Sequence, residues 1–143
     1  MSRDIKYRVW DKTSDSMLYQ DDFERVEIDT KNKMVTLIAE EESDKSHYVL
    51  DYEDGIEAEI MRYTGLKDKN GKEIYEGDIV SFYNDEEYRF KSTNALVIYD
   101  SAAFMLEHKK LGKEYLGEID IENMCIKIIG NIYENPELLE GEE

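Results

Sequence analysis

Apolar and polar residues alternate along much of this chain, and a period of two residues predicts β-strands. Ile5, Tyr7 and Val9 occupy every second position near the start, and alternate residues of a strand point to opposite faces. A strand with one apolar face is therefore predicted here. The turn-rich segment 11–16 and the apolar residues 17–19 follow it, which predicts a hairpin.

The same pattern predicts a second hairpin and a further strand before residue 65. Val26 and Ile28 precede the polar segment 30–33, and the run 34–38 that follows is rich in β-branched residues. Alternation returns after Gly55 and predicts a strand that ends near Tyr63.

Turn signals divide the second half of the chain into short strands. Asn70-Gly71 is a strong hairpin signal. The apolar runs then predict successive strands at 79–83, 95–99, 104–106 and 125–133. Near the C-terminus, Asn135 and Pro136 predict a short helical turn, with the asparagine as its cap and the proline at its first position.

Strands joined by short turns, with little helix between them, predict a mainly β fold. We predict an N-terminal β meander with an acidic loop in residues 1–61. Residues 62–143 are predicted to hold a small SH3-like barrel at about 62–133, followed by the helical turn. A glycine–aspartate turn leading into an apolar strand, as at 77–80, is common in SH3-like barrels.

Negative charge is concentrated in two blocks of the sequence. The formal net charge is −17. Counting acids against bases gives −8 for residues 40–59 (9 acids, 1 base) and −7 for residues 118–143 (8 acids, 1 base). Such a balance argues against direct binding to nucleic acid, which requires Lys and Arg against phosphates. The blocks are interpreted either as solvated faces that keep the protein soluble or as anionic surfaces for a basic partner.

The remaining composition predicts a cytoplasmic protein without cofactors. Cys125 is the only cysteine, so an intramolecular disulfide is impossible, and two histidines with one cysteine cannot form a typical zinc site. No apolar run has the length of a signal peptide core or of a membrane span, so no membrane association is expected.

Two sequence blocks resemble a known family. Residues 63–80 read YTGLKDKNGKEIYEGDIV, and residues 129–139 read IGNIYENPELL. Both resemble the YopX family of phage and prophage proteins, and residues 7–12 fit it less sharply. The resemblance implies a β-rich phage or prophage gene product, mainly of Gram-positive bacteria. It implies no activity, so it supplies no catalytic residues.

One arrangement of carboxylates invites a chemical interpretation. Glu118, Asp120 and Glu122 alternate with isoleucines, so on a strand they would line one face at spacings of about 6.6–6.8 Å. Such a row is expected either to protect an edge strand by its charge or to bind a divalent cation. No nucleophile, phosphate loop or metal motif accompanies it, and Cys125 is expected to be a small buried hydrophobe.

The leading hypothesis is a non-enzymatic binding module for an unknown host or phage protein, with self-association as a further option. A metal-dependent hydrolase using clustered carboxylates is one alternative. A second is an acidic mimic of DNA that occupies a host DNA-binding protein. The predicted interaction surface consists of the carboxylates of the two acidic blocks: Glu40, Glu41, Glu42, Asp51, Glu53, Asp54, Glu118, Asp120 and Glu122.

Overall fold

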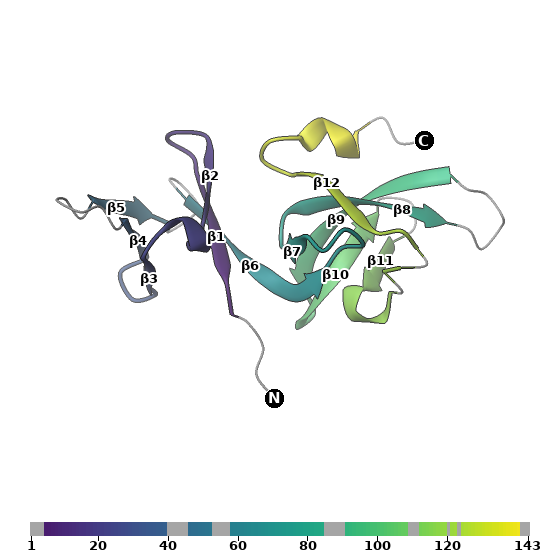
Figure 1. Cartoon of the computed structure of the whole chain (residues 1–143), viewed down its shortest axis with the longest axis horizontal. Helices are drawn as coiled ribbons and strands as arrows, with labels where there is room; N and C mark the ends of the chain where they lie inside the picture. Colours follow the sequence, from purple (N-terminus) through teal and green to yellow (C-terminus); the bar gives the residue numbers. More distant parts are fainter. Residues whose placement is uncertain are drawn as a thin grey trace. The chain divides into compact units, whose positions relative to one another are not determined.

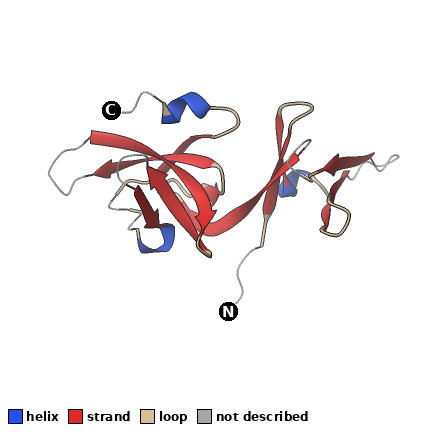
Figure 2. Ribbon diagram, turned by 180° about the vertical axis from the view of Figure 1, so that it is seen from behind, coloured by secondary structure: helices blue, strands red, loops and turns tan. Residues whose placement is uncertain are grey.

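The computed structural model describes residues 5–39, 46–52, 58–84, 91–108, 112–119, 121–122 and 124–140 (Figure 1). Strands dominate (Figure 2), with 59% strand and 10% helical content, which confirms the predicted mainly β class. The helical segments described are short 3-10 turns: η1 (Gln20–Asp22), η3 (Leu116–Glu118) and η4 (Pro136–Leu139). None of these turns approaches the length and apolar character of a membrane-spanning helix.

The chain divides into two compact units, one comprising Ile5–Arg62 and the other beginning at Tyr63. Strand β6 (Ala58–Lys67) contributes to both. Its first half pairs with β1 (Tyr7–Asp11), and its second half pairs with β7 (Glu73–Tyr75). The strand is thus longer than predicted, since it continues past Tyr63.

The N-terminal unit contains the two predicted hairpins. In the first, β1 pairs with β2 (Ser16–Tyr19). In the second, β3 (Arg25–Asp29) pairs with β4 (Met34–Ala39), and β5 (Ser46–Asp51) adds to the far side of β4. The core of this unit is formed by Val9, Val35, Leu37, Leu50 and Ala58. Strand β5 was not predicted, because it lies within the segment expected to be an acidic loop.

The predicted one-sided burial of the first strand is wrong. Ile5 lies outside β1 and is 69% exposed, whereas Arg8, Val9 and Trp10 are all buried. The charged side chain of Arg8 can be buried because it has an aromatic partner. The Arg8 guanidinium lies 5.9 Å from the centre of the Tyr19 ring, a distance at which a cation is attracted to an aromatic face.

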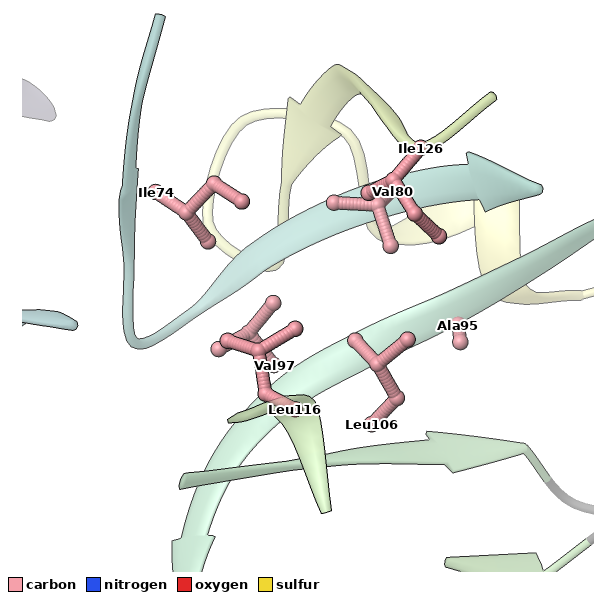
Figure 3. Packing of buried hydrophobic residues seen from close by; sticks show 7 residues of the cluster. All are labelled: Ile74, Val80, Ala95, Val97, Leu106, Leu116 and Ile126. Carbon is pink, nitrogen blue, oxygen red and sulfur yellow. The ribbon is translucent and has the colours of Figure 1, made fainter. Parts of the chain in front are cut away.

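The C-terminal unit is built on a five-stranded antiparallel sheet that curls into half a barrel. Its order is β11-β10-β9-β8-β12. The strands are β8 (Asp78–Asn84), β9 (Lys91–Asp100), β10 (Ala103–His108), β11 (Gly112–Tyr115) and β12 (Lys127–Asn131). The curl is compatible with an SH3-like barrel, and that closer assignment stays a prediction. Buried aliphatic side chains from several strands meet in the core (Figure 3): Ile74, Val80, Ala95, Val97, Leu106, Leu116 and Ile126.

The residues of the two family-like blocks build turns in this unit. Asp68 is buried and accepts hydrogen bonds from the backbone N–H groups of Asn70, Lys72 and Ile128. These bonds join the predicted Asn70-Gly71 turn to the start of β12. A side chain on Gly130 would meet Asn135, with its Cβ only 2.5 Å from Asn135 Oδ1. Asp68 and Gly130, one residue from each block, therefore have structural roles.

The predicted helical turn at the C-terminus is present as η4, with Pro136 at its start. Asn135 does not cap it through its side chain. Instead, Asn135 Oδ1 accepts a hydrogen bond from the backbone N–H of Asn131. Asn135 therefore occupies the predicted cap position, but its side chain closes the turn that precedes η4 and makes no capping bond.

Two further predictions for this unit are wrong. Glu118 ends η3 and Glu122 lies in a turn, so these carboxylates do not form a row along a strand. Asp120 lies outside the described residues. Cys125 does not open a strand, since it has a φ of 52° in the turn before β12, and its side chain is half-buried.

Candidate functional site

Most of the predicted acidic surface falls where the structure gives no description. Glu40, Glu41, Glu42, Glu53, Asp54 and Asp120 lie outside the described residues. Of the remainder, Asp51 ends β5 in the N-terminal unit and is half-buried. Glu118 and Glu122 are exposed in the C-terminal unit. The role of these carboxylates in binding stays a prediction.

A groove of about 840 Å³ lies beside β3 in the N-terminal unit. This volume is in the range of about 300–1,000 Å³ that is usual for ligand sites. We call it the β3 groove. Its lining comes from β1, η1, β3 and β6 and from the residues that flank β3 and follow β5: Tyr7, Gln20, Asp21, Phe23, Glu24, Arg25, Val26, Ile28, Thr30, Tyr52 and Ile60.

The floor of the β3 groove is apolar and firmly supported. Its apolar residues include Phe23, Val26, Ile28, Tyr52 and Ile60, and all five pack against the buried core of the unit while remaining partly accessible. Close packing against a core limits the freedom of these side chains. The groove therefore presents a preformed apolar and aromatic surface, which reduces the entropy lost when a ligand binds.

Strand β3 borders the groove along its whole length and forms one edge of its sheet. Among the described residues the order of that sheet is β3-β4-β5 (Figure 1), so within this part of the chain β3 pairs with β4 on one side only. Exposure alternates along the strand, with Val26 and Ile28 half-buried and Arg25, Glu27 and Asp29 exposed. An edge strand directs half of its backbone N–H and C=O groups away from its neighbour.

Hydrogen bonds hold both ends of the groove in place. At one end, Gln20 Oε1 accepts a bond of 3.1 Å from the backbone N–H of Tyr7, which ties η1 to β1. At the other end, the Tyr52 hydroxyl donates to the carbonyl oxygen of Asp29 at 3.2 Å. The backbone N–H of Tyr52 also donates to Lys33. The turn between β3 and β4 is thereby fastened to the end of β5.

Carboxylates gather at the end of the groove where β3 begins. Asp21, Asp22 and Glu24 are exposed and adjoin the half-buried Phe23 in the sequence, and Asp21 and Glu24 line the groove. Asp21 forms an exposed ion pair with Lys6 at 3.4 Å, which offsets part of its charge. The nearby guanidinium of Arg25 is neutralised, because its Nε lies 2.8 Å from an oxygen of Glu27. This end of the groove therefore combines an aromatic ring with negative charge, which suits a lysine or arginine side chain.

A second hollow, of about 520 Å³, lies on the C-terminal unit beside β9, β10 and η4. Its lining includes Leu96, Glu107, Lys113 and Leu139. Lys113 donates a hydrogen bond to Asp100, and this bond raises the pKa of Lys113 and lowers the pKa of Asp100. Because Lys113 is already matched by this carboxylate, the hollow offers a weaker charge for a ligand than the β3 groove does.

The described residues contain no group of three or more His, Cys, Asp and Glu side chains that could hold a metal ion. The predicted row at Glu118, Asp120 and Glu122 is not a strand. Most other carboxylates named in the two acidic blocks lie outside the described residues, so the hydrolase hypothesis stays a prediction. The β3 groove itself is lined by aromatic, aliphatic and exposed charged side chains. This combination is suited to binding a ligand.

Comparison with known proteins assigns the chain to a family. The model of the YopX protein family matches residues 6–140, which is nearly the whole chain. The chain belongs to the YopX family. The resemblance of the blocks 63–80 and 129–139 is confirmed by this match. No curated protein matches the chain.

Two solved structures of similar proteins cover almost the full length of the chain. The crystal structure of protein EF1440 from Enterococcus faecalis is 29% identical, with 97% of this chain and 100% of that chain covered and a TM-score of 0.63. The crystal structure of protein yopX from Bacillus subtilis is 28% identical, with 96% and 98% covered and a TM-score of 0.70. Proteins from two genera are thus similar to this chain in sequence and fold.

The β3 groove was not predicted from the sequence. Its lining residues extend from Tyr7 to Ile60 and come from separate segments. The sequence does contain a local signal in the acidic segment 20–24, where Phe23 stands among carboxylates directly before a strand. An aromatic residue among acids directly before a predicted strand is a local pattern that indicates a surface for cationic side chains.

Proposed function

We propose that this YopX-family chain is a non-enzymatic binding module that takes an extended segment of a partner protein in the β3 groove. The segment carries apolar side chains and at least one lysine or arginine. The observation that carries the proposal is the groove itself: an apolar, core-supported floor runs along an open edge strand and ends in a cluster of carboxylates.

Charge complementarity supports a basic partner segment. The chain has a net charge of −17, which repels acidic segments and nucleic acid and attracts cationic ones at long range. Asp21 and Glu24 supply negative charge in the groove lining, and Asp22 follows Asp21 in the sequence. Lys6 offsets part of this charge through its ion pair with Asp21. The implied phage or prophage origin makes a protein of the bacterial host, or of the phage itself, the natural source of such a segment.

The test begins with a displayed library of random peptides panned on the full-length chain. An enriched peptide is then synthesised with a fluorophore, and its Kd is measured by fluorescence anisotropy. We expect enriched peptides to combine apolar with basic residues. Their affinity should fall as sodium chloride rises, because salt screens exposed charges.

Charge-reversal variants locate the site of binding. Asp21→Lys and Glu24→Lys change exposed residues of the groove, so the fold should tolerate them. Each should weaken the peptide at least tenfold. Glu114→Lys and Glu118→Lys are matched controls on the C-terminal unit and should leave the Kd within twofold. An absence of enriched peptides, or equal effects of groove and control variants, would overturn the proposal.

A further inference from the structure

The open edge of β3 gives the proposed ligand a defined backbone conformation. We infer that the bound segment adds to the sheet as a new strand beside β3, hydrogen-bonded through its main chain. The inference rests on the proposed function, because it concerns the ligand of the same groove. Strand addition is an established mode of peptide recognition in which main-chain hydrogen bonds supply affinity and alternate side chains supply specificity.

The lining of the groove supports this geometry. It includes residues before β3, within it and after it, from Phe23 to Thr30. A ligand in the groove therefore follows the strand for its full five residues, Arg25–Asp29. An extended segment of the same number of residues spans about 17 Å at about 3.3 Å per residue. A helix would present no row of backbone groups to the edge.

The alternation along β3 dictates a sequence pattern for the ligand. Residues side by side on neighbouring strands point to the same face of a sheet. Ligand positions beside Val26 and Ile28 therefore point toward the apolar floor and should carry apolar side chains. Ligand positions beside Glu27 and Asp29 point to the opposite, exposed face. A basic side chain is favoured beside Asp29, since cross-strand pairs of opposite charge are stabilising, whereas Glu27 already pairs with Arg25.

The main test is an N-methyl scan of a peptide enriched on the full-length chain. N-methylation removes one backbone donor at a time and leaves the side chains unchanged. We expect at least a tenfold loss of affinity at every second position and little change at the positions between them. A parallel substitution scan should require apolar residues with the same period of two.

Hydrogen exchange of the protein, followed by NMR, supplies an independent measurement. Some amides of Arg25–Asp29 already pair with β4. The amides that point away from β4 should gain at least tenfold protection when the peptide is bound. The corresponding amides of β11, an edge strand of the C-terminal unit, serve as the control and should not change.

The outcomes separate the inference from the proposed function. If a peptide binds through the groove but the N-methyl effects show no alternation and β3 gains no protection, strand addition is wrong and the binding module remains. If no peptide binds, both proposals fail. If the outward amides of β3 are protected without peptide and light scattering reports a dimer, the occupant of the edge is a second copy of the chain, and the inferred ligand is wrong.

Discussion

At the scale of single residues, one carboxylate organises the longer of the two family-like blocks. Asp68 Oδ1 accepts hydrogen bonds of 2.9 Å from the backbone N–H groups of Asn70 and Lys72. Its Oδ2 accepts a third bond, also of 2.9 Å, from Ile128. The side chain is 5% exposed, so water cannot readily replace these acceptors if they are removed.

Substitution of Asp68 should therefore destabilise the chain in a graded way. Asp68→Ala leaves three N–H groups without their acceptor and should lower the free energy of unfolding by about 3 kcal/mol. Asp68→Asn retains one oxygen but turns an amide donor toward Ile128 N–H or toward the turn, and it should cost about 1–2 kcal/mol. Urea denaturation followed by circular dichroism measures both changes.

The exposed Glu118 provides a control of similar chemistry. Glu118→Ala should change the free energy of unfolding by less than about 0.5 kcal/mol, as is usual for surface positions. If Asp68→Ala were equally mild, the three hydrogen bonds would not have the structural role that we assign to them.

At the scale of secondary structure elements, the turn between β9 and β10 adopts an unfavourable conformation for its residues. Ser101 and Ala102 have φ values of 53° and 67°, in the left-handed region. Two consecutive left-handed residues are typical of a type I′ hairpin turn, which favours asparagine followed by glycine. A left-handed conformation costs an L-residue such as alanine about 1–2 kcal/mol.

Ala102→Gly should accordingly stabilise the chain. The relief of the left-handed strain is partly offset by the greater freedom of glycine in the unfolded state, so a net gain of about 0.5–1 kcal/mol is expected. Ala103→Gly, one residue further on in β10, is the matched control and should destabilise by a similar amount. Chemical denaturation of the two variants should give opposite signs, and a loss of stability for both would contradict the argument.

The hairpins could be predicted from the sequence because their information is local. The runs that became β4, β8 and β9 combine β-branched residues with flanking turn signals, and such patterns survive in almost any tertiary context. Strand β5 was missed because its short apolar run lies among acidic residues. The alternation of Glu118 and Glu122 with isoleucines was misleading, since Ile119 and Ile121 pack against the core from non-strand backbone.

The β3 groove could not be predicted, for a different reason. Val26 and Ile28 were predicted as part of a hairpin, and in the structure both pack against the core of the unit. Nothing in their local pattern says whether another element covers the open edge beside them. That depends on where η1 and β6 lie, which is a tertiary property. The site therefore emerges from contacts between segments that are far apart in the sequence, such as Tyr7 and Tyr52.

At the scale of the whole molecule, the charge of −17 is the dominant feature. Folding brings the carboxylates closer together than they are in the unfolded chain, so their mutual repulsion destabilises the compact state. Dissolved salt screens this repulsion. The Debye length falls from about 30 Å at 0.01 M to about 8 Å at 0.15 M ionic strength, and the repulsion between distant surface charges falls with it.

The melting temperature should therefore rise by a few degrees when sodium chloride is increased from 0.01 M to about 0.15 M. Differential scanning calorimetry measures this shift.

Neutralising part of the first acidic block should raise the melting temperature at low salt and reduce its salt dependence, with the substitutions Glu40→Gln, Glu41→Gln, Glu42→Gln, Glu53→Gln and Asp54→Asn. Micromolar magnesium or manganese should add nothing beyond its ionic strength. A much larger effect of the divalent cation would indicate a specific metal site, because ligands that bind only the folded state stabilise it in proportion to their affinity. A melting temperature that is flat or falls with sodium chloride would show that ion pairs, such as Lys12 with Glu59, outweigh the net repulsion.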